Sequence, residues 1–186
     1  MIQLAMEADV PRILEIEQEA ISPPWMESTL LNEIYNKDSF FALAAERRLF
    51  PSARVAPVGV GVPDDPFRWR LNRPCRGGNL PPAVEPAKDT GINIAGFIIL
   101  RQIADESELL QIAVGKAYRR RGTAGCLMSA AFGWAHGRGI KSIFLEVRES
   151  NAAAIALYAK HGFTNIGIRK NYFTEPIENA VLMRRM

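Results

Sequence analysis

Apolar positions recur along the chain with two periods, and each period predicts one kind of element. From Val10 to Ile21 they recur at helical spacing, with Asp9 as a candidate N-cap and Pro11 tolerated in the first turn. The other predicted helices run through residues 30–34, 123–136 and 152–160, and strands are predicted at 2–5, 40–45, 94–100, 109–114, 142–147, 163–168 and 180–183. Helices and strands alternate in the second half, which predicts an α/β fold with a mixed sheet covered by helices.

The segment between about residues 47 and 93 interrupts this pattern. It contains eight of the twelve prolines, a density that forbids long regular elements: Pro51, Pro57, Pro63, Pro66, Pro74, Pro81, Pro82 and Pro86. One interpretation is a surface insertion between two paired strands, and the other is a partner-binding arm that uses Phe67 and Trp69. The chain is therefore expected to be a single domain over 1–186 with an irregular, Pro-rich insertion at about 47–93.

Composition narrows the class of protein. The 186 residues are 48% hydrophobic and 23% charged, a globular balance, and no apolar run approaches the length that crosses a bilayer. The N-terminus lacks the pattern of a secretory signal, and two cysteines, Cys75 and Cys126, imply no disulfide framework. A cytoplasmic location without membrane contact is expected. The net charge of +3 fits nucleic-acid binding or a site for a polyanionic cofactor equally well.

The segment from Arg119 to Ala124 is the first candidate site. Three consecutive arginines lead into Gly122 at the predicted start of a helix, directly after a predicted strand. Unpaired N–H groups at a helix start attract anions, and a glycine lets the backbone approach them closely. The alternative is a solvated basic turn before an ordinary helix.

Glu146 and Tyr158 are the candidate acid–base groups. Glu146 lies on the opposite face of its predicted strand from the aliphatic residues, near the strand's end. Tyr158 lies in the following helix, for which Asn151 is a candidate N-cap. A terminal amine has a reference pKa near 8, so a modest base is enough to activate it. The alternatives are a solvated strand-end glutamate and a packing tyrosine.

The pattern Arg119-x-x-Gly122-x-Ala124 resembles the pyrophosphate loop of the GNAT acetyltransferases. The resemblance implies the GNAT fold, with a mixed central β-sheet of about six to seven strands flanked by about four helices. It also implies acetyl-CoA as co-substrate and no metal. The cofactor-binding residues it implies are Ile112, Ala113, Val114, Arg119, Arg120, Arg121, Gly122, Thr123, Ala124, Gly125 and Asn151.

Residues 145–158 and the pair Asn171-Tyr172 are similar to the RimI branch of this superfamily, the ribosomal-protein-alanine N-acetyltransferases. The likeness extends over nearly the whole chain outside the Pro-rich segment. It implies transfer of acetyl to a protein N-terminal amine, that of an alanine in a small-subunit ribosomal protein, with Glu146 as general base and Tyr158 as acid. Trp25 and Tyr172 are candidates for the substrate groove, or else aromatic packing residues.

Two other functions stay open at this point. The acceptor could be a lysine side chain or a small-molecule amine, which keeps the enzyme class. The chain could also be a non-catalytic module that binds CoA or associates with the ribosome, since the insertion is basic. No direct contact with nucleic acid is expected, and no metal-ligand spacing accompanies His136 or His161.

Overall fold

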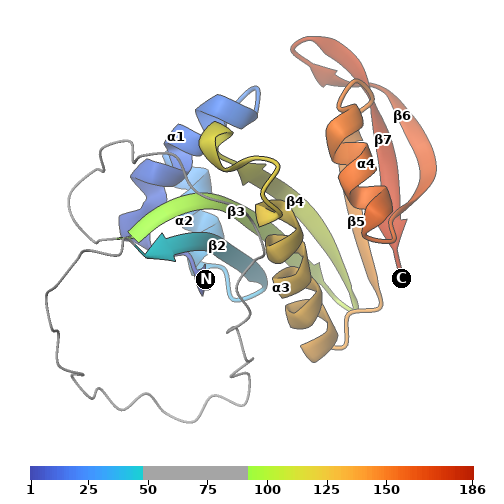
Figure 1. Cartoon of the computed structure of the whole chain (residues 1–186). Helices are drawn as coiled ribbons and strands as arrows, with labels where there is room; N and C mark the ends of the chain where they lie inside the picture. The colour runs from blue at the N-terminus through green and yellow to red at the C-terminus, as the bar shows by residue number, and fades with distance from the viewer. Residues whose placement is uncertain (48–91) are drawn as a thin grey trace, which may run out of the picture.

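The computed structural model of the chain describes residues 1–47 and 92–186 (Figure 1). The predicted insertion at about 47–93 falls almost entirely outside the described residues, together with Phe67, Trp69 and Cys75. The two interpretations of the insertion and the expectation about the cysteines therefore stay predictions.

The described strands form one seven-stranded sheet in the order β1-β2-β3-β4-β5-β7-β6. Their bounds are β1 Ile2–Leu4, β2 Ser39–Arg47, β3 Ile92–Ile103, β4 Glu106–Val114, β5 Ser142–Arg148, β6 Thr164–Thr174 and β7 Ile177–Arg185. Neighbouring strands are antiparallel except β4 and β5, which run parallel. The predicted mixed sheet is confirmed, and β2 and β3 form the expected antiparallel pair.

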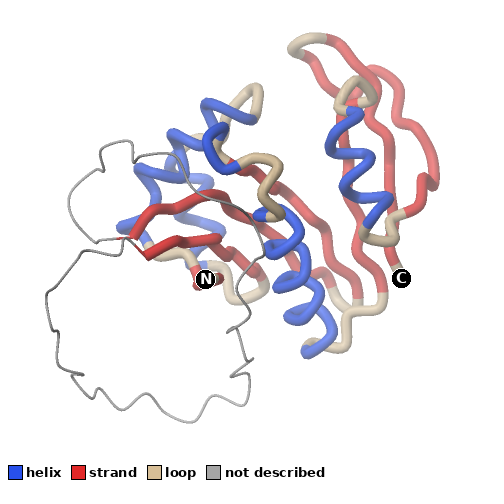
Figure 2. Tube along the Cα trace, viewed as in Figure 1, coloured by secondary structure: helices blue, strands red, loops and turns tan. Residues whose placement is uncertain are grey.

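Four α-helices cover the described sheet in two layers (Figures 1 and 2). They are α1 Val10–Ala20, α2 Glu27–Tyr35, α3 Thr123–Gly137 and α4 Ala152–Lys160, with 3-10 turns at Glu7–Asp9 and Lys116–Tyr118. The first two helices pack on one face of the sheet, and α3 and α4 pack on the other. This arrangement confirms the predicted α/β architecture.

The side chains of β3 pack alternately against the helices on the two faces of the sheet. Phe97 and Ile99 pack with the residues of α1 and α2, whereas Ile98 and Leu100 pack with those of α3. All four are fully buried. Successive side chains of a strand point to opposite faces, so a strand covered on both faces is apolar at every position.

Asp9 does not cap α1 in the way the sequence predicts. It occupies the N-cap position, but its carboxylate accepts a hydrogen bond from the N–H of Met6 at 2.9 Å. The reason is that Glu7–Asp9 forms a 3-10 turn that continues directly into the helix. Asp9 already has helical backbone angles, and its side chain closes the start of that turn instead.

The pairing of β4 with β5 is the feature that shapes the site. The two strands are paired only where Glu106, Ser107 and Glu108 face Ser142, Ile143 and Phe144. Beyond these residues the strands diverge, as Figure 1 shows, while β4 stays paired with β3. The sheet therefore opens into a V between β4 and β5.

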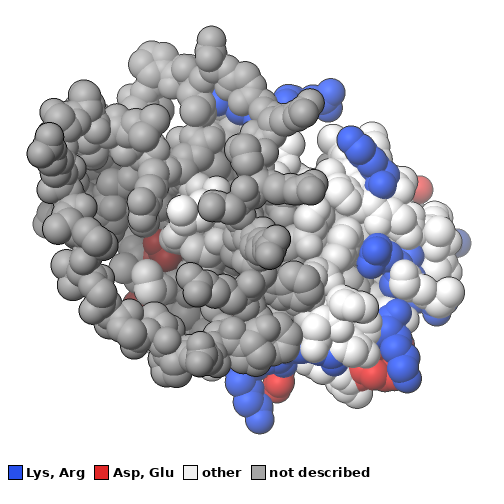
Figure 3. All heavy atoms as spheres, turned by 60° about the horizontal axis from the view of Figure 1, so that its bottom comes forward, with Lys and Arg blue, Asp and Glu red and all other residues white. Residues whose placement is uncertain are grey.

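The described surface carries charged side chains of both signs (Figure 3). On the described surface that is visible in Figure 3, Lys and Arg side chains lie in several separate groups, and Asp or Glu side chains lie beside some of them. Within residues 1–47 and 92–186, every helix is too short or too polar to cross a membrane.

Candidate active site

The edge of β4 that faces β5 is open over residues 109–114. No strand pairs with this edge among the described residues, because the β4–β5 ladder ends at Glu108. Exposed N–H and C=O groups along a strand edge can bind an extended chain that carries amides. Ile112, Ala113 and Val114, which were expected to bind the cofactor, belong to this stretch.

Gly122 begins α3 in the left-handed conformation, with φ +83°. A Cβ atom at this position would meet no atom within 4 Å, so glycine is required for its backbone angles and not for space. The first backbone N–H in α3 with a backbone acceptor is that of Cys126, bonded to Gly122 at 3.0 Å. Within the described chain, the N–H groups of residues 122–125 thus donate no hydrogen bond to a backbone carbonyl. They are suited to bind an anion.

The three arginines of this loop have different surroundings. Arg119 is turned back onto the protein, where its Nε donates to the carbonyl of Val114 at 2.9 Å and its Nη2 to the carbonyl of Glu19 at 3.3 Å. Arg120 is exposed. Arg121 has a buried Nη1 without a hydrogen-bond partner among the described residues, which an anion would supply. Arg119 therefore braces the loop, and Arg121 is the better placed donor.

Glu146 lies on β5 and contacts two side chains of β6, Arg169 and Tyr172. Its Oε1 is 2.7 Å from Nη1 of Arg169, whose guanidinium lies 4.8 Å from the ring centroid of Tyr172. A hydrogen bond to Glu146, followed by burial, raises the pKa of the Tyr172 hydroxyl, and the charge of Glu108 on β4 adds to this. Carboxylates on both diverging strands, Glu146 on β5 and Glu108 on β4, therefore raise the pKa of Tyr172. The Tyr172 residue is 43% exposed and lies beside the opening.

Tyr158 lies on the other face of β5. It is 6% exposed, belongs to the core beneath α4, and its ring centroid is 5.7 Å from that of Phe163. Leu145 and Val147 share this core, so Glu146 points to the opposite face, as the alternation along the strand predicts. Burial raises the pKa of Tyr158, which keeps the hydroxyl protonated at neutral pH.

Asn151 is the N-cap of α4, as predicted. Its Oδ1 accepts a hydrogen bond from the N–H of Ala154 at 3.1 Å. The helix ends at Lys160, and its C-cap His161 is followed by Gly162 with φ +85°, a common helix ending. A contact between Asn151 and the cofactor stays a prediction.

Trp25 belongs to the loop between α1 and α2, where it packs against the core under these helices. Its backbone N–H donates to Oε2 of Glu17 at 3.1 Å. Glu17 is fully buried; burial raises its pKa, while hydrogen bonds from Trp25 and from the Gln111 side chain lower it. Glu17 therefore holds the loop that carries Trp25 to α1, on the side that faces Gln111 of β4.

Several polar residues of this region were not identified from the sequence. They are Glu17, Gln111, Arg148, Arg169 and Glu178. One signal was present for Glu17, which stands in the apolar stripe of α1 at the spacing of Val10, Ile13 and Ile21. The others carry no local signal, because their partners lie on other elements.

The fold and the open, glycine-capped site define this protein as an acetyltransferase of the GNAT family. The family model described as "Acetyltransferase (GNAT) family" matches residues 47–163. The chain belongs to this family. It is an acetyl-CoA-dependent N-acetyltransferase.

Within the family, the chain is similar to enzymes that act on a ribosomal protein. It is 32% identical over 98% of its length to the [ribosomal protein bS18]-alanine N-acetyltransferase of Haemophilus ducreyi, of which the match covers 97%. The corresponding Escherichia coli K12 enzyme is 41% identical over 92 residues, which cover 48% of this chain and 62% of that enzyme.

Solved structures agree with the likeness in sequence. The crystal structure of the ribosomal-protein-S18-alanine N-acetyltransferase from Escherichia coli has a TM-score of 0.68 and 26% identity. The match covers all of this chain and 92% of that one. NAA60 of Arabidopsis thaliana has a TM-score of 0.70 at 14% identity, which shows the shared fold.

Proposed function

We propose that this enzyme acetylates the α-amine of a protein N-terminus, that of an alanine in a small-subunit ribosomal protein. The observation that carries the proposal is the opening between β4 and β5. It lies between the unpaired N–H groups at the start of α3 and the cluster of Glu146, Arg169 and Tyr172. The similarity to the bS18-alanine N-acetyltransferase of Haemophilus ducreyi, which extends over almost the whole chain, supports the choice of acceptor.

The open edge of β4 and the start of α3 fit acetyl-CoA. The N–H groups of residues 122–125, with Arg121 beside them, would hold the pyrophosphate. The backbone of residues 112–114 would pair with the amides of the pantetheine arm, since this edge has no strand partner in the described chain. Acetyl-CoA supplies an activated thioester, so the protein needs no covalent intermediate of its own.

Glu146 and Tyr158 divide the proton transfers between the two faces of β5. Glu146 accepts the proton that the amine nitrogen gives up as the C–N bond forms, directly or through a water. Tyr158 donates a proton to the sulfur as the C–S bond breaks. Burial raises the pKa of Tyr158, so the hydroxyl carries its proton at neutral pH, as this step requires. The ion pair with Arg169 restricts the Glu146 carboxylate to one orientation.

The acceptor would approach from the side of Trp25 and Tyr172. Trp25 stands in the loop after α1, and Tyr172 lies beside Glu146. On this proposal the partner is a protein N-terminus, and the enzyme works in the cytoplasm, where ribosomal proteins are made.

Mass spectrometry of a peptide with an N-terminal alanine tests the proposal. With enzyme and acetyl-CoA, the peptide should gain about 42 Da at its α-amine. The control is the same peptide with a blocked N-terminus and one internal lysine, which should gain no mass. Gain on the lysine alone would move the acceptor to side-chain amines, and no gain on any amine of a broad panel would remove the proposal.

A further inference from the structure

Arg148 is the last residue of β5 and stands two positions beyond Glu146. Because side chains of a strand alternate between its faces, Arg148 shares the face of Glu146, away from the core residues Leu145 and Val147. Two residues along a strand span roughly 7 Å, so Arg148 lies just beyond the candidate base. Its side chain is only 18% exposed.

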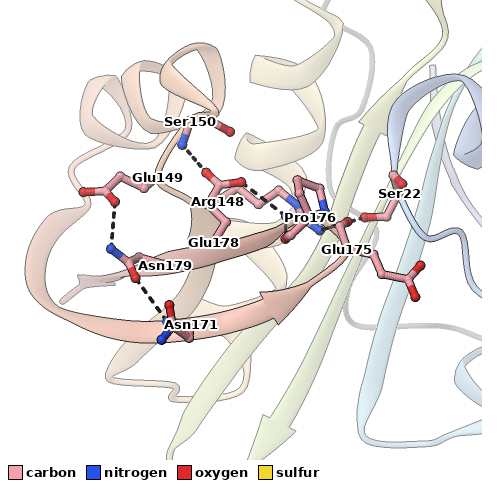
Figure 4. A network of polar contacts seen from close by, with 9 residues as sticks. All are labelled: Ser22, Arg148, Glu149, Ser150, Asn171, Glu175, Pro176, Glu178 and Asn179. Carbon is pink, nitrogen blue, oxygen red and sulfur yellow. Dashed lines mark hydrogen bonds and ion pairs between the residues drawn. The ribbon is translucent and has the colours of Figure 1, made fainter.

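The two terminal nitrogens of Arg148 contact four acceptors from two separate segments (Figure 4). Nη2 donates to the carbonyl of Ser22 at 3.2 Å and to that of Glu175 at 2.8 Å. Nη1 donates to the carbonyl of Pro176 at 3.1 Å and to Oε2 of Glu178 at 3.2 Å. Ser22 belongs to the α1–α2 loop, and the other three belong to the β6–β7 turn and the start of β7.

This arrangement requires an arginine. Each terminal nitrogen carries two hydrogens, so the planar fork can serve all four acceptors at once, whereas a lysine has one nitrogen. Ser22 and Glu175 each precede a proline in irregular backbone, where no ladder supplies a donor for their carbonyls. The guanidinium carbon also lies 4.3 Å from the ring centroid of Phe173, which covers its face.

Neighbouring contacts fix the β6–β7 end to the segment that follows β5. Oε1 of Glu178 accepts a hydrogen bond from the N–H of Ser150 at 2.5 Å. Asn179 donates to Oε2 of Glu149 at 3.0 Å and accepts from the N–H of Asn171 at 3.1 Å. The β6–β7 turn is thus held from two sides, and among the described side chains only Arg148 also bonds to the α1–α2 loop.

Arg148 joins the α1–α2 loop to the β6–β7 turn, two segments with no direct hydrogen bond or ion pair between them in the described chain. In the described part of the chain, no hydrogen bond or ion pair runs directly from residues 21–26 to β6 or β7. Trp25 follows Ser22 by three positions, and Tyr172 precedes Glu175 by three. The two residues proposed to flank the acceptor therefore stand on the two segments that Arg148 connects.

We propose that Arg148 is a positioning residue that connects the α1–α2 loop to the β6–β7 turn and thereby sets the affinity for the acceptor amine. The inference rests on the proposed function in one respect, namely that the acceptor enters between these segments. Arg148 itself touches neither reacting group, so its loss should change acceptor binding far more than binding of acetyl-CoA.

Steady-state kinetics of Arg148→Gln, Arg148→Lys and the matched control Arg12→Gln test this role. Arg12 is a half-buried arginine of α1 whose ion pair among the described residues is with Glu15 of the same helix. In Arg148→Gln the KM for the acceptor peptide should rise about tenfold or more, with the KM for acetyl-CoA within about twofold of wild type. Arg148→Lys should rescue little of this loss, and Arg12→Gln should behave as wild type.

Hydrogen exchange of the same variants, without substrate, gives a readout that does not depend on activity. In Arg148→Gln, amides of residues 21–26 and 174–178 should both exchange faster than in wild type, while those of β3 should not change. Unchanged exchange in either segment, or equal rises of both KM values, would overturn the role of Arg148. If the wild-type enzyme acetylates no N-terminal peptide, the proposed function fails, and the exchange comparison still decides whether Arg148 connects the two segments.

Discussion

The two arms of the V are stabilised in different ways. Strands β2 and β3 are covered by helices on both faces, and every residue of β3 from Ile94 to Leu100 with a side chain is buried and apolar. In the other arm, β5 and β7 contribute core side chains on one face only, beneath α4. The outer strand β6 has no buried residue, and polar contacts help to hold it: Arg169 with Glu146, and Asn171 with Asn179. The cofactor is proposed to bind along the apolar arm, and the acceptor beside the polar arm.

This difference indicates a division of labour. An apolar core covered on both faces is rigid and gives a fixed frame for a large, invariant co-substrate. The uncovered face of the other arm carries polar side chains and is held by directional contacts that single side chains control, which suits the recognition of one particular N-terminus. The following predictions test the comparison, beginning with the largest expected effect.

Glu146→Gln removes the candidate base from the polar arm. Turnover should fall by about 10²- to 10⁴-fold, the usual range for general acid–base groups, and the activity that remains should require a higher pH. Affinity for acetyl-CoA, measured by calorimetry, should not change. The control is Glu106→Gln, an exposed glutamate at the start of β4, which should keep wild-type turnover; equal kinetics in both variants would reject the base assignment.

Ile98→Ala and Ile168→Ala compare the same substitution in the two arms. Ile98 is 0% exposed and Ile168 is 52% exposed. The first should lower the free energy of unfolding by about 2–5 kcal/mol, and the second by less than about 1 kcal/mol. Urea denaturation followed by circular dichroism measures both. Similar losses would mean that the β6–β7 arm is packed as tightly as the β2–β3 arm.

Tyr158→Phe keeps the packing against Phe163 and removes only the hydroxyl. Turnover should fall about a hundredfold, while the acetyl-CoA affinity and the melting temperature stay close to wild type. Because burial raises the pKa of Tyr158 above its usual value of 10, the wild-type pH profile should show no loss of activity from this hydroxyl below pH 10. A variant with normal turnover would leave Tyr158 as a packing residue.

Gly122→Ala and Gly133→Ala compare two glycines of α3. Neither added Cβ would meet an atom within 4 Å, but only Gly122 has a positive φ. Gly122→Ala should cost about 1 kcal/mol of stability and raise the KM for acetyl-CoA, with the peptide KM unaffected. Gly133→Ala should stabilise by about 0.5–1 kcal/mol, since alanine is the better helix residue. A peptide-specific effect of Gly122→Ala would contradict the division between the arms.

Glu17→Gln tests the buried carboxyl group beside β4. Burial raises the pKa of Glu17 above 4.5, so the folded state favours the protonated form. Its stabilising contribution is present below the unfolded-state value and is lost as pH rises through the raised value. The variant, which does not titrate there, should therefore gain stability relative to wild type as pH increases from about 4 to 8. A constant difference across this range would mean that Glu17 titrates normally.

The order of helices and strands was predictable from the sequence. Their predicted bounds were more accurate for buried elements than for exposed ones. The strand at 142–147 and the helix at 152–160 lie within one residue of β5 and α4, because their apolar positions face a core. The strands predicted at 163–168 and 180–183 are shorter than β6 and β7. β6 is largely exposed and the ends of β7 are at most partly buried, so these stretches show no hydrophobic period that would have marked them as strand.

The sequence by itself determined the α/β class, the glycine at the start of α3, the faces of β5 and the N-cap of α4, since each depends on residues close together in the chain. Only the tertiary structure decided the partners of the charged side chains. Arg119 bonds the carbonyl of a residue 100 positions away, and Arg148 that of a residue 126 positions away. Such contacts leave no periodic trace in a sequence, because a guanidinium or a carboxylate can pair with any suitable group that the fold brings near.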